Sequence, residues 1–472
     1  GEHAPGVEPG PGLDARVEAT LAGLDPAEVA QVTRVSPVPV TEIWPLSPLQ
    51  EGLFFHASYD TDGLDVYTAQ DVFDLDHRVD LARLRRAGAA LLTRNPGIRA
   101  GFTDTGLSRP VQFVAETTEL PVVEVDLTGL DPRRQAERMA RLLAEDRHRR
   151  FDLARPPLCR LMLIRLGDDR DRLVLSHHLV LWDGWSAALV VDQLFTLYAR
   201  DGDDRDLPPA GSYREHLAWL AAQETEPAHR AWREALAGLA EPTLVAPEAT
   251  LTPVVPQRCR ADLPAPLGER MRAAVRRHGL TLNTLCGAAW GLVLGGLLGR
   301  TDVVFGMTVS GRNPEIPHVE QIVGLLLNTV PARVRVDPYE PVPALLHRLQ
   351  QQRAELMPYD HLGLGEVQRL SGHSRLFDTL YVFQNFVDEE ESARLRARHG
   401  IVAVDGVDAT HYPLTLVVTP GRTIRLTLDH RPDVVPAELA RTLLDRYVAV
   451  LARLADALDA TGVDAVDDRS EP

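Results

Sequence analysis

Two adjacent histidines followed closely by an Asp-Gly pair are the residues of this sequence best suited to chemistry. His177 and His178 lie in the segment SHHLVLWDGWS, residues 176–186. An imidazole has a reference pKa of about 6.5, so it can accept a proton and return it near neutral pH. The segment therefore predicts acid–base work at a histidine, with structural packing of both rings as the plainer alternative.

The elements around this segment decide which histidine is accessible. The run 172–176 predicts a strand that ends at the histidines, and the apolar spacing of 183–198 predicts a helix after a short loop. Neighbouring residues of a strand point to opposite faces of the sheet. We therefore expect one imidazole in the interior and the other at a cleft, which favours one catalytic histidine over a two-histidine metal site, and no bound metal.

The remaining chain mixes predicted helices and strands in both halves. Helices are expected over 80–94, 132–147, 213–223, 228–236, 267–278 and 282–298, and strands over 66–75, 158–166, 259–263, 303–309, 332–336, 380–385, 414–418 and 423–428. The polar stretch 201–211 is the best domain boundary on composition. The acidic insert 388–391 and the tail 467–472 suggest solvated surface or disorder.

Composition excludes several classes of function. All 50 basic residues are arginine, so a Schiff-base lysine and a P-loop lysine are absent. The net charge of −17 opposes binding to nucleic acid or an anionic membrane. Three separated cysteines suggest neither disulfides nor a zinc cluster. The start of the sequence has no secretory pattern, and the most apolar run, 285–298, is too short for a membrane span, so a cytoplasmic protein is expected.

Six ordered segments resemble the motifs of condensation domains from non-ribosomal peptide synthetases. The histidine segment resembles the HHxxxDG signature, which relatives in the chloramphenicol acetyltransferase superfamily share. The other five segments are residues 45–56 (PLSPLQEGLFFH), 95–102 (NPGIRAGF), 302–312 (DVVFGMTVSGR), 322–333 (IVGLLLNTVPAR) and 376–385 (LFDTLYVFQN). The resemblance covers about residues 42–454.

The resemblance implies an α/β (α+β) fold of two chloramphenicol-acetyltransferase-like lobes in a V, a pseudo-dimer within one chain. We expect a linker or docking segment at 1–36, an N-terminal lobe at 37–208, a C-terminal lobe at 209–465 and a tail at 466–472. Tunnels from opposite faces would meet at the histidine motif. No cofactor would be bound directly.

The implied reaction joins two carrier-bound substrates. Upstream (donor) and downstream (acceptor) peptidyl carrier proteins would present an acyl or peptidyl thioester and an aminoacyl thioester on phosphopantetheine arms, and the acceptor amine would attack the donor carbonyl to give an amide. An adenylation domain would adjoin the chain in the parent synthetase. The alternatives are a catalytically silent docking platform, an ester-forming relative and an epimerase.

Site roles carry over residue by residue. His178 matches the general-base or amine-positioning histidine and His177 the structural one, while Asp183 and Gly184 match the closing pair and Arg312 the salt-bridge partner of the aspartate. The usual spacer has three residues, whereas residues 179–182 make four. Anchoring on Asp-Gly instead would put Leu179 in the catalytic place, but a leucine neither accepts a proton nor orients an amine.

A further set of residues is expected near the substrate tunnel. Ser47 is expected to cap the helix that begins at Pro48. The tunnel candidates, each with a structural role as the alternative, are Arg99, Trp182, Ser186, Asn328, Gln384 and Asn385.

Overall fold

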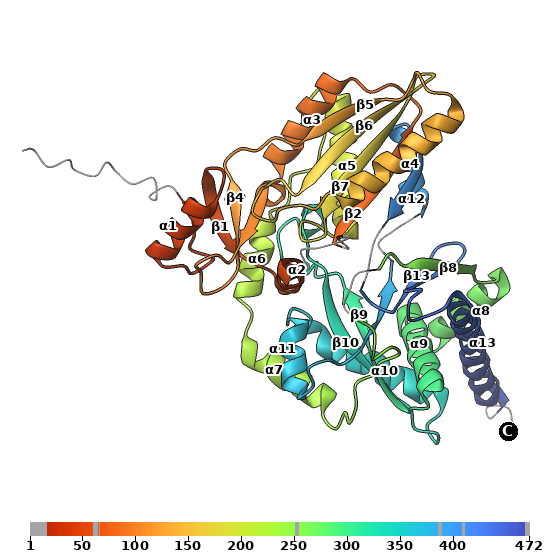
Figure 1. The fold of residues 1–472 in the computed structure, drawn as a ribbon. Helices are drawn as coiled ribbons and strands as arrows, with labels where there is room; N and C mark the ends of the chain where they lie inside the picture. Colours follow the sequence, from red (N-terminus) through yellow and green to blue (C-terminus); the bar gives the residue numbers. More distant parts are fainter. Residues whose placement is uncertain are drawn as a thin grey trace, which may run out of the picture.

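Three sheets organise the part of the chain that the structure describes. The computed structural model describes residues 17–59, 65, 67–250, 254–385, 389–407 and 411–467. Figure 1 shows the two larger sheets in an upper and a lower half, with a small sheet beside the upper half near the N-terminus. The mixed helix-and-sheet architecture matches the expected fold class.

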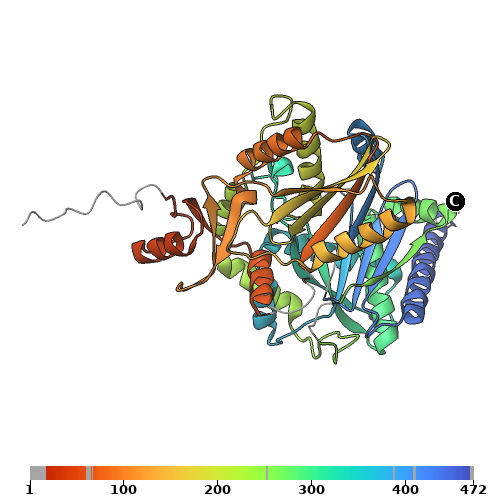
Figure 2. The same ribbon diagram turned by 45° about the horizontal axis from the view of Figure 1, so that its top comes forward.

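The upper sheet contains the strand that carries the histidines. Its five strands lie in the order β12 (Ile401–Val407), β2 (Thr68–Leu75), β7 (Arg170–His178), β6 (Cys159–Gly167) and β5 (Val122–Asp126). Helices α3 (Leu81–Arg94) and α5 (Gly184–Ala199) pack on one face, where Leu173 and Leu175 of β7 are buried. Helix α4 (Pro132–His148) covers the other face around Val174 (Figure 2). Alternate residues of β7 therefore enter two different cores.

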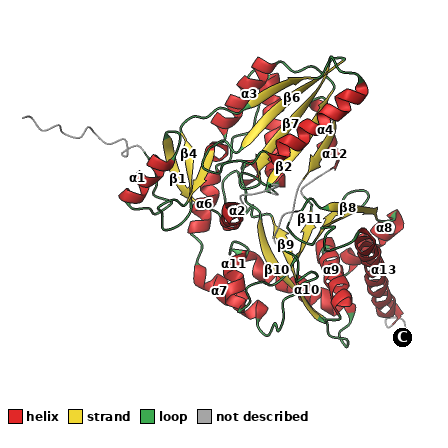
Figure 3. Cartoon of the chain, viewed as in Figure 1, coloured by secondary structure: helices red, strands yellow, loops and turns green. Residues whose placement is uncertain are grey.

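The lower sheet carries the largest core. Its six strands lie in the order β10 (Asn328–Arg335), β9 (Asp302–Val309), β11 (Thr379–Phe383), β13 (Leu414–Thr419), β14 (Arg425–His430) and β8 (Gln257–Asp262). Figure 3 shows helices gathered at one side of it, namely α8 (Ala265–Arg277), α9 (Leu282–Leu298), α10 (Val342–Leu356) and α13 (Ala437–Asp467). Helix α9 spans the expected residues because Thr281 caps its first turn and Gly299 ends it in the left-handed conformation.

The small sheet and the connecting helices link the two halves. The small sheet has the order β1 (Val40–Pro45), β4 (Val111–Ala115) and β3 (Ala100–Thr103), and α2 (Pro48–Tyr59) follows β1. The remaining helices are α1 (Pro26–Val35), α6 (Tyr213–Ala221), α7 (Thr225–Leu236), α11 (Leu364–Ser371) and α12 (Glu389–Arg398). Short 3-10 turns lie at Pro96–Arg99, Val319–Gln321 and Met357–Tyr359.

The described part of the expected linker at 1–36 is folded. Asp25 and Glu28 form a capping box at the start of α1, and Ala22 and Val32 are fully buried against the small sheet. Burial of these apolar side chains holds residues 17–36 against the small sheet, and the rest of the expected segment, residues 1–16, lies outside the described ranges. At the other end, α13 continues through Asp467, and the rest of the expected tail lies outside these ranges too.

One strand of the upper sheet comes from the C-terminal half of the sequence. The strand β12 pairs antiparallel with β2, from Ile401 opposite Leu75 to Val407 opposite Gln70. Figure 1 shows α12 and β12, coloured blue, beside the early strands of the upper half. The expected lobe at 209–465 therefore does not lie wholly in the lower half, because residues 389–407 form part of the upper half.

Among the described residues no single helix has the length and hydropathy of a membrane span, and α8 with α9 reaches them only as a pair bent by 111°.

Candidate active site

Strand β7 carries both histidines in unbroken register. His177 lies opposite Ala69 of β2 and Cys159 of β6, and His178 lies opposite Thr68. The His178 N–H donates to the carbonyl oxygen of Leu158 at 2.9 Å. Because the ladder continues through residue 178, the two imidazoles leave the sheet on opposite faces.

His177 enters the core shared with α3 and α5. Its ring stacks on the indole of Trp182, with centroids 4.1 Å apart and planes 18° apart. Burial, with a smaller effect of His178, lowers the pKa of His177 to about 3. His177 is thus a neutral packing residue, and Trp182 is its partner in the core.

His178 lies on the α4 face beside Tyr67, whose ring centroid is 6.2 Å from its own. Its Nδ1 accepts a hydrogen bond from the Val180 N–H at 3.1 Å. The residue is only 1% exposed, and burial lowers its pKa to about 4, with Asp65 opposing and Arg150 adding to that shift. The ring is therefore neutral at pH 7.

The four-residue spacer forms a turn between strand and helix. The Leu181 N–H donates to the His178 carbonyl oxygen at 3.1 Å, and the Leu179 N–H donates to the Tyr67 carbonyl oxygen at 2.7 Å. Val180 is fully buried, whereas the Leu179 side chain is half-buried. The turn accommodates the spacer without disturbing either the strand or the helix start.

Gln50, from the segment 45–56, supports this turn. Its Nε2 donates to the Val180 carbonyl oxygen at 2.9 Å, while its Oε1 accepts from the Ser47 N–H and from Nε2 of Gln112, both at 3.0 Å. Ser47 caps the same helix start, because its Oγ accepts from the Gln50 N–H at 3.3 Å. The residue that binds Nδ1 of His178 is thereby held by a buried network.

Asp183 joins the helix start to the C-terminal half. Its Oδ1 accepts from the Ser186 N–H at 2.9 Å and from Nη2 of Arg312 at 3.1 Å. Its Oδ2 accepts from the N–H groups of Leu326 and Leu327 at 3.1 and 3.2 Å. The carboxylate therefore has four donors from two regions of the chain, and Gly184 is the exposed first residue of α5.

Arg312 completes this junction. Its Nη1 donates to the carbonyl oxygens of Val319 and Ile322 at 2.7 and 3.0 Å, and its Nη2 also donates to Oγ of Ser186 at 2.8 Å. The Arg312 and Asp183 side chains are 5% and 4% exposed. The pair binds the loop 310–327 to the histidine segment, and Ser186 takes part in the junction rather than facing an open passage.

The other tunnel candidates have partners elsewhere. Arg99 donates to the carbonyl oxygens of Ala115 and Leu92 and so supports the end of α3, while Nδ2 of Asn328 donates to those of Asp360 and Leu362. These contacts are structural, because each side chain satisfies backbone groups at chain turns. At the end of β11, Gln384 is half-buried and bonded to β13, and Asn385 is exposed.

A row of rings beyond His178 lies outside the sequence predictions for the site. Tyr67 stacks on His56 of α2 with centroids 6.5 Å apart, His56 lies 5.8 Å from His411, and His411 lies 4.5 Å from Tyr412. The row crosses from the upper half to the lower one. His56 belongs to the motif at 45–56, and His411 and Tyr412 are residues of the second half that a lobe interface could bring near the tunnel, although nothing in their spacing demands it.

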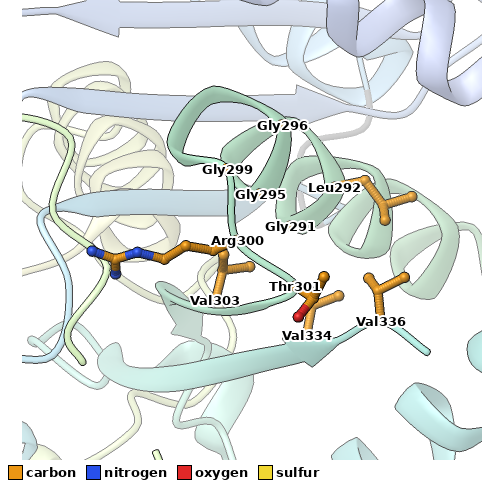
Figure 4. A pocket seen from close by; sticks show the side chains of 10 residues that line it. All are labelled: Gly291, Leu292, Gly295, Gly296, Gly299, Arg300, Thr301, Val303, Val334 and Val336. Atoms are coloured by element: carbon orange, nitrogen blue, oxygen red, sulfur yellow. The ribbon is translucent and has the colours of Figure 1, made fainter. Parts of the chain in front are cut away.

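A hollow among the described residues lies away from the histidines. It has a volume of about 270 Å³ between the end of α9 and strands β9 and β10 (Figure 4). Its lining is largely glycine and valine, and the Arg300 side chain extends away to the Pro242 carbonyl oxygen at 2.6 Å. Among the described residues, no group of three or more His, Cys, Asp or Glu side chains is arranged to hold a metal ion.

The sequence and the fold have clear relatives. The family model described as "Condensation domain" matches residues 40–465. Chondramide synthase cmdD of Chondromyces crocatus is 32% identical over 386 residues, which cover 78% of this chain and 10% of that protein. Bacitracin synthase 1 of Bacillus licheniformis is 29% identical over 420 residues, covering 86% of this chain and 8% of that protein. The chain thus spans only a small part of the length of these relatives.

Solved structures agree on the fold. The first condensation domain of the calcium-dependent antibiotic synthetase, in complex with a substrate analogue, has a TM-score of 0.67 at 22% identity and covers 87% of this chain and 96% of that chain. The condensation domain from the monacolin K polyketide synthase MokA has a TM-score of 0.70 at 18% identity, covering 88% and 98%. These matches confirm the expected chloramphenicol-acetyltransferase-like fold. The chain therefore belongs to the condensation domain family of the non-ribosomal peptide synthetases.

Proposed function

We propose that this domain forms an amide bond between two substrates held as thioesters on separate carrier proteins. The acceptor amine attacks the donor carbonyl, and both substrates arrive on phosphopantetheine arms of the upstream and downstream carriers. The observation that supports this function is the placement of His178, which leaves the sheet opposite the packed His177 and lies where the two halves are joined by Asp183 and Arg312.

Positioning supplies much of the proposed catalysis. Two tethered reactants held in line react as a unimolecular system, which is worth many orders of magnitude over free encounter. The junction formed by Asp183 and Arg312 fixes the loop after His178 against the lower half. In this arrangement the imidazole keeps one position relative to both halves.

Substrates reach His178 only when its cover moves. The ring is 1% exposed, and Tyr67, His56 and His411 form the row that leads from it to the lower half. Because the row consists of side-chain rings, rotation of these rings would part it while the junction stays in place. We propose that arrival of the loaded arms opens this row.

Reconstitution with loaded carriers tests the function. The parent chain, a donor carrier bearing an aminoacyl thioester and an acceptor carrier bearing a second one are mixed, and carrier-bound dipeptide is measured by mass spectrometry. We expect dipeptide on the acceptor arm, and a loss of about 10²–10³-fold with His178→Leu. His177→Phe is the matched control, because its ring packs on Trp182 in the core and a phenyl ring can keep that stacking. No dipeptide from the folded parent would refute the proposal.

A silent docking platform is the second candidate. Two observations favour it. When the motif is aligned on Asp-Gly, the half-buried Leu179 takes the place of the catalytic histidine, and His178 itself is almost completely buried. The platform would bind both carriers with unchanged affinity after His178→Leu and would yield no product with any donor. Binding without turnover in the parent would therefore favour it.

A further inference from the structure

The hydrogen bonding of His178 determines which ring nitrogen carries the proton. Nδ1 accepts from the Val180 N–H at 3.1 Å. A nitrogen that accepts a hydrogen bond carries no proton of its own, and a neutral imidazole has one proton to place. That proton therefore lies on Nε2. The assignment follows from the heavy-atom contact and makes the ring a donor on its other side.

The partner of Nδ1 is fixed. Val180 is fully buried, and its carbonyl oxygen accepts from Nε2 of Gln50 at 2.9 Å. Gln50 is in turn bonded to the Ser47 N–H and to Gln112. Releasing Nδ1 would leave a buried N–H without an acceptor and would displace this network. Nδ1 is thus unavailable as a proton acceptor for a substrate.

Nε2 is differently placed. It makes no hydrogen bond to any residue of the described ranges. The groups around the ring are Tyr67, Thr68, Asp65 and Arg150, and burial keeps the ring neutral, with a pKa of about 4. A neutral imidazole with a free N–H is suited to polarising a carbonyl oxygen, and it is unsuited to removing a proton at that nitrogen.

We propose that His178 serves the condensation reaction as a hydrogen-bond donor, through Nε2–H, to the oxygen of the donor thioester carbonyl. This role rests on the proposed amide-forming function and replaces the expected role as a general base or amine-positioning residue.

The reaction balances without proton transfer to His178. The lone pair of the acceptor amine forms the new C–N bond, and the C=O π pair moves to the oxygen, whose negative charge accepts the Nε2–H hydrogen bond. Collapse re-forms C=O and breaks the C–S bond, so that the donor arm leaves as a thiolate. The proton lost by the nitrogen passes through water to that thiolate and gives the free thiol.

Two substitutions separate a donor from a base. In His178→Gln the amide can place an N–H near the position of Nε2 but cannot accept a proton, whereas His178→Leu has neither property. We expect the Gln variant to keep dipeptide formation within about 10-fold of the parent and the Leu variant to lose about 10²–10³-fold, as for one oxyanion donor. Circular dichroism and thermal melting of both variants establish that they are folded.

The pH profile provides a second measure. With a donor, the acidic limb belongs to the acceptor amine and has the same midpoint in the parent and the Gln variant. With a base, that limb includes the imidazole and is lost or shifted by the substitution. A folded Gln variant as inactive as the Leu variant would overturn the proposal while leaving amide formation intact, whereas a parent without product would overturn both.

The tautomer can be observed without turnover. With 15N-labelled histidine, the signals missing from His178→Gln are those of His178 in the parent. We expect at pH 7 an unprotonated Nδ1 that accepts a hydrogen bond and a protonated Nε2. A protonated Nδ1 in the parent would overturn the proposal independently of any turnover measurement.

Discussion

Removing the guanidinium of Arg312 should destabilise the junction between the two halves. In Arg312→Met the chain keeps a side chain of comparable length but loses four hydrogen bonds, to Val319, Ile322, Ser186 and Asp183. The Asp183 carboxylate then remains buried without its cation. Its other three donors are backbone N–H groups, which stay in place.

The magnitude follows from the burial of the pair. Removing one partner of a buried ion pair typically costs about 3–5 kcal/mol, because the remaining charge is uncompensated. The three retained N–H donors place Arg312→Met near the lower end, about 3 kcal/mol. In a double-mutant cycle with Asp183→Asn, residues in one network should show a coupling of about 1–3 kcal/mol.

Urea unfolding of the parent, Arg312→Met, Asp183→Asn and the double variant measures the loss of stability and the coupling energy. Tryptophan fluorescence follows the transition that reports the junction. Arg133→Met is the control, since its partner Glu137 and Arg133 itself are 58% and 89% exposed and such pairs contribute about 0–1 kcal/mol. A cost below about 1 kcal/mol for Arg312→Met, or additive effects in the cycle, would refute this account of the junction.

Three further predictions concern the same region. Gly311→Ala should abolish dipeptide formation and lower the melting temperature, because Gly311 has φ +66° and a Cβ there would lie 1.7 Å from the Leu326 carbonyl oxygen; a parent-like melting curve would contradict this. The pKa of His177 is about 3 in the folded chain against an ordinary value of 6.5. Its contribution to stability is therefore complete above pH 6.5 and declines toward pH 3 by up to about 1.4 kcal/mol per pH unit. Urea titrations at different pH values should show a shallower decline in His177→Phe. Gln50→Ala should cost about 1–3 kcal/mol and reduce turnover, since the Val180 carbonyl oxygen loses its donor, whereas unchanged turnover would show that the turn holds without it.

Sequence patterns predict the elements that depend on local signals. The helix at 282–298 has a threonine cap and a glycine stop, and the strand before the histidines contains the apolar run 173–175. The acidic insert at 388–391 suggests solvated surface or disorder, and its described residues begin the surface helix α12, on which Glu390 and Glu391 are exposed. The following strand β12 has 64% exposed Val402, and it forms because β2 offers a distant pairing edge that no local pattern reveals.

The site shows the same division. Alternation along a strand predicts that the two histidines part, and the structure places them on opposite faces. The Asp183–Arg312 contact spans 129 residues and is expected only through the family resemblance. The donor state of His178 depends on Val180 and Gln50, which are 130 residues apart. Contacts of that range are set by tertiary packing.

The crossing of residues 389–407 has a practical meaning for engineering. Suppose that the second half of this domain is exchanged at residue 208 for that of a relative. The first half would then receive a foreign β12 along β2 and a foreign α12 against α5. In the native chain Asp192 of α5 binds His399 and Arg398 there. A chimera that retains residues 389–407 together with their native partner strand β2 preserves that edge. The segments to be kept together in such an exchange are therefore not consecutive in the sequence.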